Sequence, residues 1–248
     1  LGFNSKKDIE HFGLDKFSLA CRARVEKYSA VQTEQSEKLG QWMDFGKDYF
    51  TMADSNIEAI WFFLAKCHKE GWLYKGQRSL PWCIRCGTSS SKHEMSDDGY
   101  AELVHPSVYV KAKLKGRENE YLLLWTTTEW TLSSNIAAAV HPDVTYVQAK
   151  KGNDILYLAE ALVQKLKKDY IVLKKLKGKE LVGWEYESFY PDFEVQKGIV
   201  HKVVPWNDVG EKDGTGIVHI APSCGEEDYQ LGKKLGLKIL DAALDDFG

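Results

Sequence analysis

The sequence predicts an α/β fold in which a helical segment precedes a strand-rich module. Up to about residue 75, apolar residues recur at helical spacing, whereas from about residue 100 short runs of β-branched and aromatic residues follow one another. Glycines and prolines separate these runs, and no internal repeat or low-complexity linker interrupts the chain. At 248 residues, the chain is long enough for one large domain or two modest ones, each with a buried core.

The N-terminal part is expected to contain two amphipathic helices. Their apolar positions are Leu14, Phe17, Ala20 and Cys21 in the first, and Ile57, Ile60, Trp61, Leu64 and Ala65 in the second. Ser55 and Glu58 have the spacing of a capping box at the start of the second helix, and Gly71 stands where a left-handed cap would end it. We therefore expect this helix to have well-defined ends.

The C-terminal part is expected to be an α/β module. Strands are predicted at residues 107–114, 120–127, 144–149, 155–158, 171–173 and 216–221, and helices at residues 159–168 and 228–235. Spacing alone does not predict whether the strands close into a barrel.

Composition excludes several classes of protein. A formal net charge of -3 argues against a surface that binds nucleic acid along its whole extent, although a local basic patch is compatible with it. Five cysteines without an apolar leader are typical of a reducing compartment, so we expect a cytoplasmic protein. No apolar run approaches the roughly 20 residues of a membrane-spanning helix, so we expect no membrane role.

Two polar stretches at the ends of predicted strands are the strongest functional signal. The first, residues 125–135, reads Trp-Thr-Thr-Thr-Glu-Trp-Thr-Leu-Ser-Ser-Asn and follows an apolar strand. The second, residues 213–222, reads Asp-Gly-Thr-Gly-Ile-Val-His-Ile-Ala-Pro and leads into Gly225, Glu226, Glu227, Asp228 and Tyr229. Hydroxyls, an imidazole and carboxylates thus come at strand ends, which indicates one polar site.

These residues resemble the editing insertion of class I isoleucyl-tRNA synthetases. The usual form of that insertion reads Thr-Thr-Thr-Pro-Trp-Thr-Leu-Pro-(Ser/Ala)-Asn and then Gly-Thr-Gly-(Ile/Ala)-Val-His-x-Ala-Pro-x-x-Gly-x-(Glu/Asp)-Asp-Tyr. The valyl and leucyl relatives typically continue after the threonines with Arg-Pro-Glu-Thr or Arg-Pro-Asp-Thr, so residues 130–132, Trp-Thr-Leu, favour the isoleucine enzyme. Residues 42–52, 72–76 and 81–87 are similar to the segment that precedes the insertion, and the resemblance covers nearly the whole chain.

The resemblance implies an organisation in three parts. Residues 1–75 would be a helical part of the Rossmann-type catalytic domain, residues 76–100 a zinc-knuckle-like connector, and residues 101–248 an editing domain with a β-barrel-like core decorated by helices. Neither a His-x-Gly-His signature nor a Lys-Met-Ser-Lys-Ser loop occurs in the sequence. We therefore expect a fragment of a larger ligase, in which the parent enzyme uses ATP and this piece does not.

The implied reaction is hydrolysis of valine from wrongly charged tRNA. Discrimination between isoleucine and valine is the standard example of how little selectivity binding alone can provide. One methylene in an apolar pocket gives only about 1–3 kcal/mol of discrimination. A second, hydrolytic site without a cofactor removes the error. The partners implied are the aminoacylated 3′ end of the tRNA for isoleucine, its valine moiety and the remainder of the parent synthetase.

The resemblance also implies roles for individual residues. Catalytic positions would be Thr126, Thr127, Thr128, Thr131, His219 and Asp228, and substrate-binding positions Trp130, Asn135, His219 and Asp228. Asp228 would pair with the α-ammonium group of valine, and His219 would line the amino-acid pocket and exclude the larger isoleucyl group. From the residues alone, Asp228 as a helix cap and His219 as a core histidine are alternatives. Because side chains alternate along a strand, Thr126 and Thr128 should share one face and Thr127 the other.

Two departures from the usual pattern leave a second hypothesis open. Glu129 and Ser133 stand where the family usually has prolines, which makes the loop more flexible and adds a charge. The alternative is therefore a non-catalytic tRNA-binding or structural insertion with an impaired pocket. A third hypothesis makes Cys224 a nucleophile with His219 as its base.

Cys83 and Cys86 form half of a zinc-knuckle pattern. Two thiolates separated by two residues can bind one tetrahedral ion, and Gly87 allows the tight turn. The family supplies its second pair beyond the editing domain, so zinc binding is expected only with ligands outside this chain.

Overall fold

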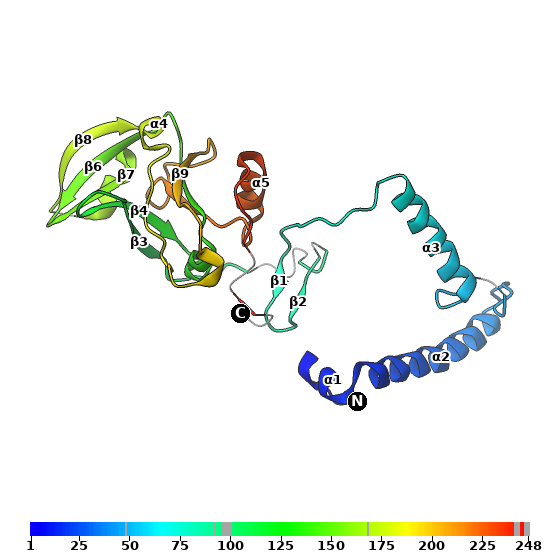
Figure 1. The fold of residues 1–248 in the computed structure, drawn as a ribbon. Coiled ribbons are helices and arrows are strands. Elements are labelled where there is room, and N and C mark those ends of the chain that lie inside the picture. The colour runs from blue at the N-terminus through cyan, green and yellow to red at the C-terminus, as the bar shows by residue number, and fades with distance from the viewer. Residues whose placement is uncertain (48, 92, 96–100, 168, 241–243, 246–248) are drawn as a thin grey trace. The chain divides into compact units, whose positions relative to one another are not determined.

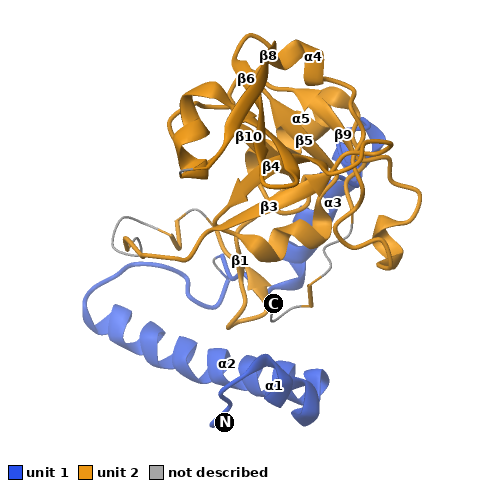
Figure 2. Ribbon diagram, turned by 90° about the vertical axis from the view of Figure 1, so that its left-hand side faces the viewer, with its two compact units in different colours: residues 1–77 blue, residues 78–248 orange. Residues whose placement is uncertain are grey.

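The computed structural model describes residues 1–248 except 48, 92, 96–100, 168, 241–243 and 246–248. The chain divides into two compact units, Leu1–Gln77 and Arg78–Gly248 (Figure 2). The three-part division at residues 75 and 100 stays a prediction.

The unit Leu1–Gln77 is helical. Its helices are α1 (Lys6–Phe12), α2 (Leu14–Lys38) and α3 (Asp54–Lys69) (Figure 1). The capping box predicted for Ser55 and Glu58 is wrong, because the N-cap of α3 is Ala53, two residues earlier, and Ser55 lies inside the first turn. The predicted end is confirmed: Gly71 has a φ of +74°, and the next amide, of Trp72, donates to the carbonyl of Cys67.

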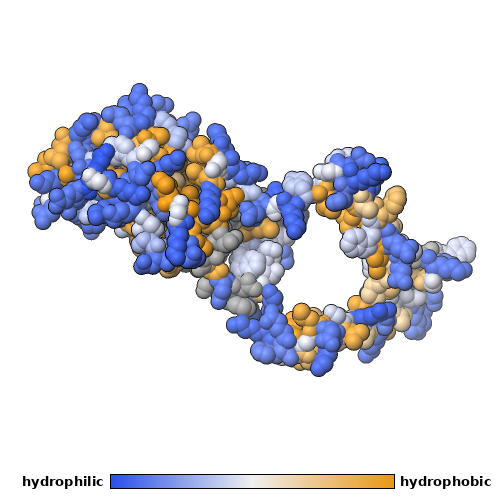
Figure 3. Space-filling model, in the orientation of Figure 1, coloured by the Kyte–Doolittle hydropathy of each residue, from blue (hydrophilic) through white to orange (hydrophobic). Residues whose placement is uncertain are grey.

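Helix α3 leaves large apolar side chains on the surface of this unit. Ile60, Trp61, Phe62 and Phe63 are 51%, 66%, 78% and 63% exposed, and apolar residues gather along the surface of the helical unit in Figure 3. In α2 and α3 no described residue is buried. The unit therefore does not bury the apolar positions that predicted its helices.

The unit Arg78–Gly248 contains the described strands. Its elements are β1 (Trp82–Cys83), β2 (Thr88–Ser89), β3 (Val108–Lys113), β4 (Glu120–Thr126), η2 (Glu129–Ser134), β5 (Ala137–Val140), β6 (Thr145–Lys151), β7 (Asp154–Ala159), η3 (Glu160–Leu166), β8 (Ile171–Lys177), α4 (Gly178–Leu181), η4 (Glu194–Gln196), β9 (Lys202–Pro205), β10 (Ile217–Ile220) and α5 (Glu226–Leu235), where η marks a 3₁₀ helix. The mixed α/β fold predicted from the sequence is confirmed.

Among the described residues, the strands form three sheets and no closed barrel. A five-stranded sheet has the order β3-β4-β7-β6-β8, a three-stranded sheet has the order β10-β5-β9, and β1 pairs with β2 in a hairpin. Most pairs are antiparallel, but β4 runs parallel to β7, and β5 runs parallel to β9. Strand β10 also lies beside β4, so the two larger sheets come together there.

The main core lies between the two larger sheets. Leu122 and Leu124 of β4, Ala138 of β5 and Ile217 of β10 are all at most 1% exposed within it. The short strands β5 and β9 were not predicted, and the helix predicted at residues 159–168 is instead the 3₁₀ helix η3. Because β10 pairs with β5 and lies beside β4, both predicted polar stretches start from this core.

Candidate functional site

The threonine segment begins where β4 leaves the core. Thr126 is the last residue of β4 and is 7% exposed, and η2 follows directly with Thr131 at 9%. The hydroxyls of Thr126 and Thr128 lie 3.2 Å apart, whereas Thr127 is exposed. The alternation predicted for these three residues is therefore what the structure has.

A hydrogen-bonded chain links these hydroxyls to the imidazole of His219. The hydroxyl oxygens of Thr128 and Thr131 are 3.4 Å apart, and Thr131 Oγ1 lies 3.0 Å from His219 Nε2. The Thr131 hydroxyl donates its proton to the carbonyl of Thr128 at 2.7 Å. Since a hydroxyl has one proton, Nε2 of His219 must carry a hydrogen and donate to Thr131.

The tautomer leaves Nδ1 of His219 as a buried acceptor. Among the described residues no group donates to it, and it is the buried side-chain polar atom without a partner. Burial lowers the pKa of His219 to about 4, so the ring is neutral at physiological pH. His219 is 8% exposed, and its strand neighbours Ile217 and Ile220 are buried as well. A neutral ring at this position can donate a hydrogen bond and fill space.

Asp228 lies in the first turn of α5, close to the end of β10. It is the third residue of the helix, after the N-cap Gly225, and its carboxyl forms a hydrogen bond with the backbone of Ala221. Burial, together with the charge of Glu227, raises the pKa of Asp228 to about 7 against the opposing effect of that hydrogen bond. Because ionising this carboxyl without a partner is costly, a bound cation would stabilise its charged form.

Gly225 provides the room for this carboxyl. A Cβ atom at position 225 would lie 2.3 Å from Asp228 Oδ2, closer than any real contact. The backbone there is extended, with a φ of -121°, so the glycine is not required by its dihedral angles. Glycine suits position 225 because the Asp228 side chain approaches its backbone so closely.

The remaining predicted substrate-binding residues lie in opposite environments. Trp130 is 50% exposed, with its indole at the surface of η2. Asn135 is 1% exposed, and its side chain accepts a hydrogen bond from Tyr186 Oη at 2.7 Å and donates one to the carbonyl of Ala137 at 2.9 Å. Asn135 thus holds the backbone that follows η2, and its contact with a substrate stays a prediction.

Sequence reasoning missed the residues behind Asn135. Gln196 and His201 are 5% and 2% exposed, and both contact the carbonyl oxygen of Asn135. They come from η4 and from the residue before β9, far along the chain from the threonine segment. No local spacing signals them.

The cysteine pair lies in the small hairpin of β1 and β2. Hydrogen bonds from the backbone and side chain of Cys86 lower the pKa of the Cys83 thiol, and the same pairing raises the pKa of the Cys86 thiol. The two thiols thus interact with each other, and zinc binding by this pair stays a prediction. Nowhere in the described part of the chain do three or more His, Cys, Asp or Glu side chains gather to hold a metal.

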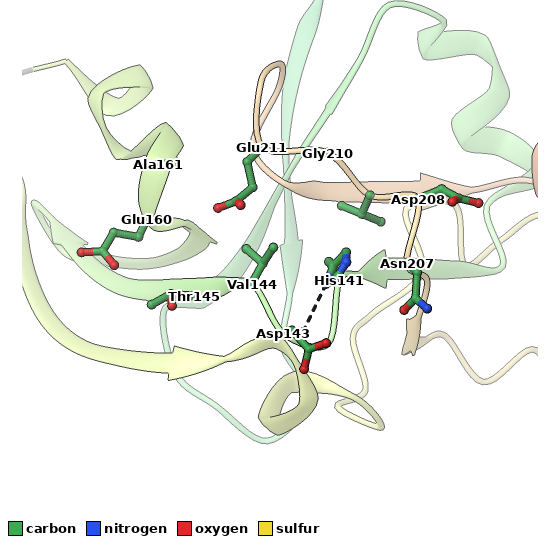
Figure 4. A pocket seen from close by; sticks show the side chains of 11 residues that line it. His141, Asp143, Val144, Thr145, Glu160, Ala161, Asn207, Asp208, Gly210 and Glu211 are labelled. Atoms are coloured by element: carbon green, nitrogen blue, oxygen red, sulfur yellow. Dashed lines mark hydrogen bonds between the residues drawn. The ribbon is translucent and has the colours of Figure 1, made fainter.

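An open cavity of about 840 Å³ lies elsewhere in the same unit (Figure 4). Its charged lining includes the carboxylates of Asp143, Glu160, Asp208 and Glu211, while His141 accepts a hydrogen bond from the backbone of Asp143 at 3.2 Å. None of the predicted site residues lines this cavity. We take the hydrogen-bonded group of Thr126, Thr128, Thr131 and His219, together with Asp228 beyond the end of β10, as the candidate site.

The sequence comparisons place the chain among the aminoacyl-tRNA synthetases. The family described as tRNA synthetases class I (I, L, M and V) matches residues 1–207, and the chain belongs to this family. No described helix is long and apolar enough to cross a membrane.

Within the family, the chain is similar to isoleucine–tRNA ligases. It is 43% identical over 242 residues to the isoleucine–tRNA ligase of Clostridium novyi (strain NT) and 41% identical over 241 residues to that of Clostridium acetobutylicum. It is likewise 41% identical over 241 residues to isoleucine–tRNA ligase 2 of Bacillus anthracis. Each match covers 97% of this chain and 23% of the relative, so the chain spans about a quarter of the length of these relatives.

Two solved structures show a distant likeness. One is GlLeuRS-CP1, with a TM-score of 0.47, 17% identity, and coverage of 52% of this chain and 58% of that chain. The other is the cytosolic leucyl-tRNA synthetase editing domain of P. knowlesi, with a TM-score of 0.44, 17% identity, and coverage of 52% and 62%.

Proposed function

We propose that the chain carries the site at which an isoleucine–tRNA ligase hydrolyses valine from wrongly charged tRNA. The observation that carries this proposal is the hydrogen-bonded chain from Thr126 through Thr128 and Thr131 to His219. Asp228 adds a carboxyl near the end of the strand that holds His219. The parent ligase attaches isoleucine to its tRNA with ATP, in the cytoplasm, and requires residues beyond this chain.

The reaction adds water to the ester carbonyl of valyl-tRNA and breaks the bond to the terminal ribose oxygen. The products are valine and a tRNA with a free hydroxyl, so no cofactor is consumed. Hydroxyl groups can both donate and accept, which suits the threonines to orient the attacking water and the ribose without forming a covalent bond. Among the hydrogen-bonded threonines, Thr128 is the one that is partly exposed, so its hydroxyl has room for such a contact.

Asp228 would bind the α-ammonium group of the valine. An ammonium group removed from water requires a fixed anionic partner, because leaving it unpaired costs several kcal/mol. The same pairing would favour the ionised form of Asp228 and lower its pKa from about 7 when substrate binds.

His219 would select valine by its bulk and its hydrogen bond. With a pKa near 4 it is too weak a base to remove a proton from water efficiently at neutral pH. A neutral ring fixed by Thr131 is suited to limit the size of the amino-acid pocket. The expected discrimination is therefore hydrolysis of the valyl ester and survival of the isoleucyl ester.

The deciding experiment compares deacylation of valyl-tRNA and isoleucyl-tRNA, both made with the tRNA for isoleucine, by the 248-residue chain and by its Asp228→Ala variant. We expect selective loss of the valyl ester with the wild-type chain. The variant should be slower by roughly tenfold to hundredfold, as expected for loss of a fixed charge partner. Equal decay of the valyl ester with both proteins would contradict the proposal.

A second candidate is a tRNA-binding insertion without hydrolytic activity. It is favoured by the departures at Glu129 and Ser133, which place an exposed charge and a serine in η2. Under this hypothesis the chain binds the tRNA but leaves both esters intact. A tRNA-binding assay beside the deacylation assay separates the two candidates.

Two other expectations are part of the proposal for the parent enzyme. Cys83 and Cys86 would hold zinc together with two ligands from outside this chain. The exposed apolar side chains of α3 would pack against the remainder of the parent synthetase. Cys224 is not proposed as a nucleophile, because it is exposed and His219 Nδ1 accepts no hydrogen bond from any described group.

A further inference from the structure

A buried group of polar side chains lies behind the threonine segment. Its members, which we call the clamp, are Asn135, Tyr186, Gln196 and His201, with exposures of 1%, 0%, 5% and 2%. Burying so many polar groups is costly unless each one is paired, so the hydrogen-bond partners of the clamp indicate which part of the backbone it holds in place.

Gln196 makes the contacts that reach the segment itself. Its Nε2 donates to the carbonyl of Ser133 at 2.7 Å and to the carbonyl of Asn135 at 3.1 Å. Both carbonyls need a donor, so the amide nitrogen of Gln196 must face them and its oxygen must face away. His201 Nε2 lies 2.9 Å from that oxygen and donates to it, which fixes the orientation of the amide.

Asn135 and Tyr186 extend this restraint to the start of β5. Tyr186 Oη donates to Asn135 Oδ1, and Asn135 Nδ2 donates to the carbonyl of Ala137. Ala138, the next residue, pairs directly with His219 in the sheet. The backbone between Thr131 and the strand paired with His219 is thus held by buried hydrogen bonds at the carbonyls of Ser133, Asn135 and Ala137.

The consequence concerns the distance from Thr131 to His219. Thr131 and Ser133 belong to the same 3₁₀ turn, so a shift of the Ser133 carbonyl moves the Thr131 hydroxyl relative to the ring. Displacement of a reacting group by about 1 Å can slow a reaction by roughly a hundredfold. The hydrogen bonds of Gln196 go to two backbone carbonyls and to His201 rather than to the side chains of Thr128, His219 or Asp228, yet they determine where the segment that carries Thr131 lies.

We propose that Gln196, oriented by His201, is a positioning residue for the hydrolytic reaction, an inference that rests on the proposed function. It acts by donating hydrogen bonds to the carbonyls that follow Thr131. A chain that loses these donors keeps its substrate-binding groups and loses their alignment. Loss of these donors should therefore lower kcat and leave KM nearly unchanged.

The test is Gln196→Glu in the 248-residue chain. This substitution keeps the shape of the side chain, but an ionised carboxylate cannot donate to the two carbonyls. At neutral pH we expect kcat for valyl-tRNA deacylation to fall roughly tenfold to hundredfold, with KM within about twofold of the wild type. At mildly acidic pH the introduced carboxyl regains a proton and a donor, so the ratio of variant to wild-type kcat should recover.

Gln164→Glu is the matched control, because Gln164 is exposed and the same change of charge there should leave kcat unaltered at every pH. Gln196→Met removes the donors without adding a charge, and its loss of kcat should not recover in acid. If Gln196→Glu does not fold, the Gln196→Met variant decides through the same split between kcat and KM.

Hydrogen exchange of residues 126–136 provides a readout that does not depend on activity. We expect faster exchange confined to this segment in Gln196→Glu at neutral pH, and wild-type exchange in acid. Wild-type kcat in both Gln196 variants, or a loss in Gln196→Glu that does not recover in acid, would overturn the proposal. An inactive wild-type chain would refute the proposed function instead, and local exchange would then decide: acceleration confined to the segment supports the positioning role, and unchanged exchange overturns it.

Discussion

At the scale of single residues, the Asp228 carboxyl can lie over the start of α5 because position 225 has no Cβ. We predict that Gly225→Ala raises KM for valyl-tRNA roughly tenfold, equivalent to about 1.4 kcal/mol, because the new methyl group displaces the carboxyl. The extended backbone at this position tolerates alanine, so the melting temperature should change little.

The double variant with Asp228→Ala is the control for this prediction. Without the carboxyl, the methyl group has nothing to displace, so Gly225→Ala should add no further effect. The same increase of KM in both backgrounds would show that Gly225 acts through the helix and not through Asp228.

Single residues also show which features of the candidate site could be predicted from the sequence and which could not. Alternation along β4 predicted that Thr126 and Thr128 share a face, because a strand has a strict period of two. It could not predict the burial of Asn135, since that depends on Tyr186, Gln196 and His201, which reach it from loops more than fifty residues away. Polar partners of this kind leave no local pattern.

At the scale of elements, β10 reaches the site through a turn that requires glycine. Gly216 has a φ of +71°, and a Cβ atom there would lie 2.4 Å from the Cβ of Ala159 in β7. We predict that Gly216→Ala destabilises the unit by roughly 2–4 kcal/mol, because left-handed strain and overpacking add. Urea unfolding measures this loss.

Two other glycines separate the contributions to this effect. Gly152 has a φ of +60° with open space around it, so Gly152→Ala should cost only the strain, roughly 1–2 kcal/mol. Gly210 has neither a left-handed backbone nor a near neighbour, so Gly210→Ala should be neutral within about 0.5 kcal/mol. Equal losses for Gly216→Ala and Gly152→Ala would exclude the contact with Ala159 as a cause.

The elements that the sequence did not predict are short and poor in β-forming signals. Strand β5 reads Ala-Ala-Ala-Val, and all of it is buried. Its small side chains suit a central strand between β9 and β10, but alanine is a weak strand former, so packing and not propensity decides its conformation. The same reasoning applies to β9, which has only four residues and ends at Pro205.

At the scale of the whole molecule, the sequence predicted the class of fold and not the pairing of its strands. The parallel pairs β4 with β7 and β5 with β9 join strands that are distant in the sequence, and no local period encodes them. The family resemblance located the threonine segment and the His219 strand in one site because both motifs were recognised together. Three members of the clamp, Tyr186, Gln196 and His201, lie outside both motifs, and only the folded unit brings them to Asn135.

Two titrating groups of the site have opposite effects on the stability of the molecule. The pKa of His219 falls from 6.5 to about 4 on folding, so its contribution is complete above pH 6.5 and is lost as the pH falls towards 4. The pKa of Asp228 rises from 3.8 to about 7, so its contribution is complete below pH 3.8 and is lost as the pH rises towards 7. In the overlap of these windows each slope approaches about 1.4 kcal/mol per pH unit, and the two nearly cancel.

Removing one group should therefore expose the slope of the other. We predict that Asp228→Asn makes the free energy of unfolding, relative to the wild type, rise with pH between about 4 and 6.5, because the loss caused by ionising Asp228 is gone. His219→Gln should make the same difference fall with pH over this range. Urea unfolding at a series of pH values measures both, and a difference from the wild type that does not vary with pH would show that these groups titrate alike in the folded and unfolded chain. The raised pKa of Asp228 means that ionising this carboxyl costs stability in the folded chain, a cost that the proposed binding of an ammonium group would remove.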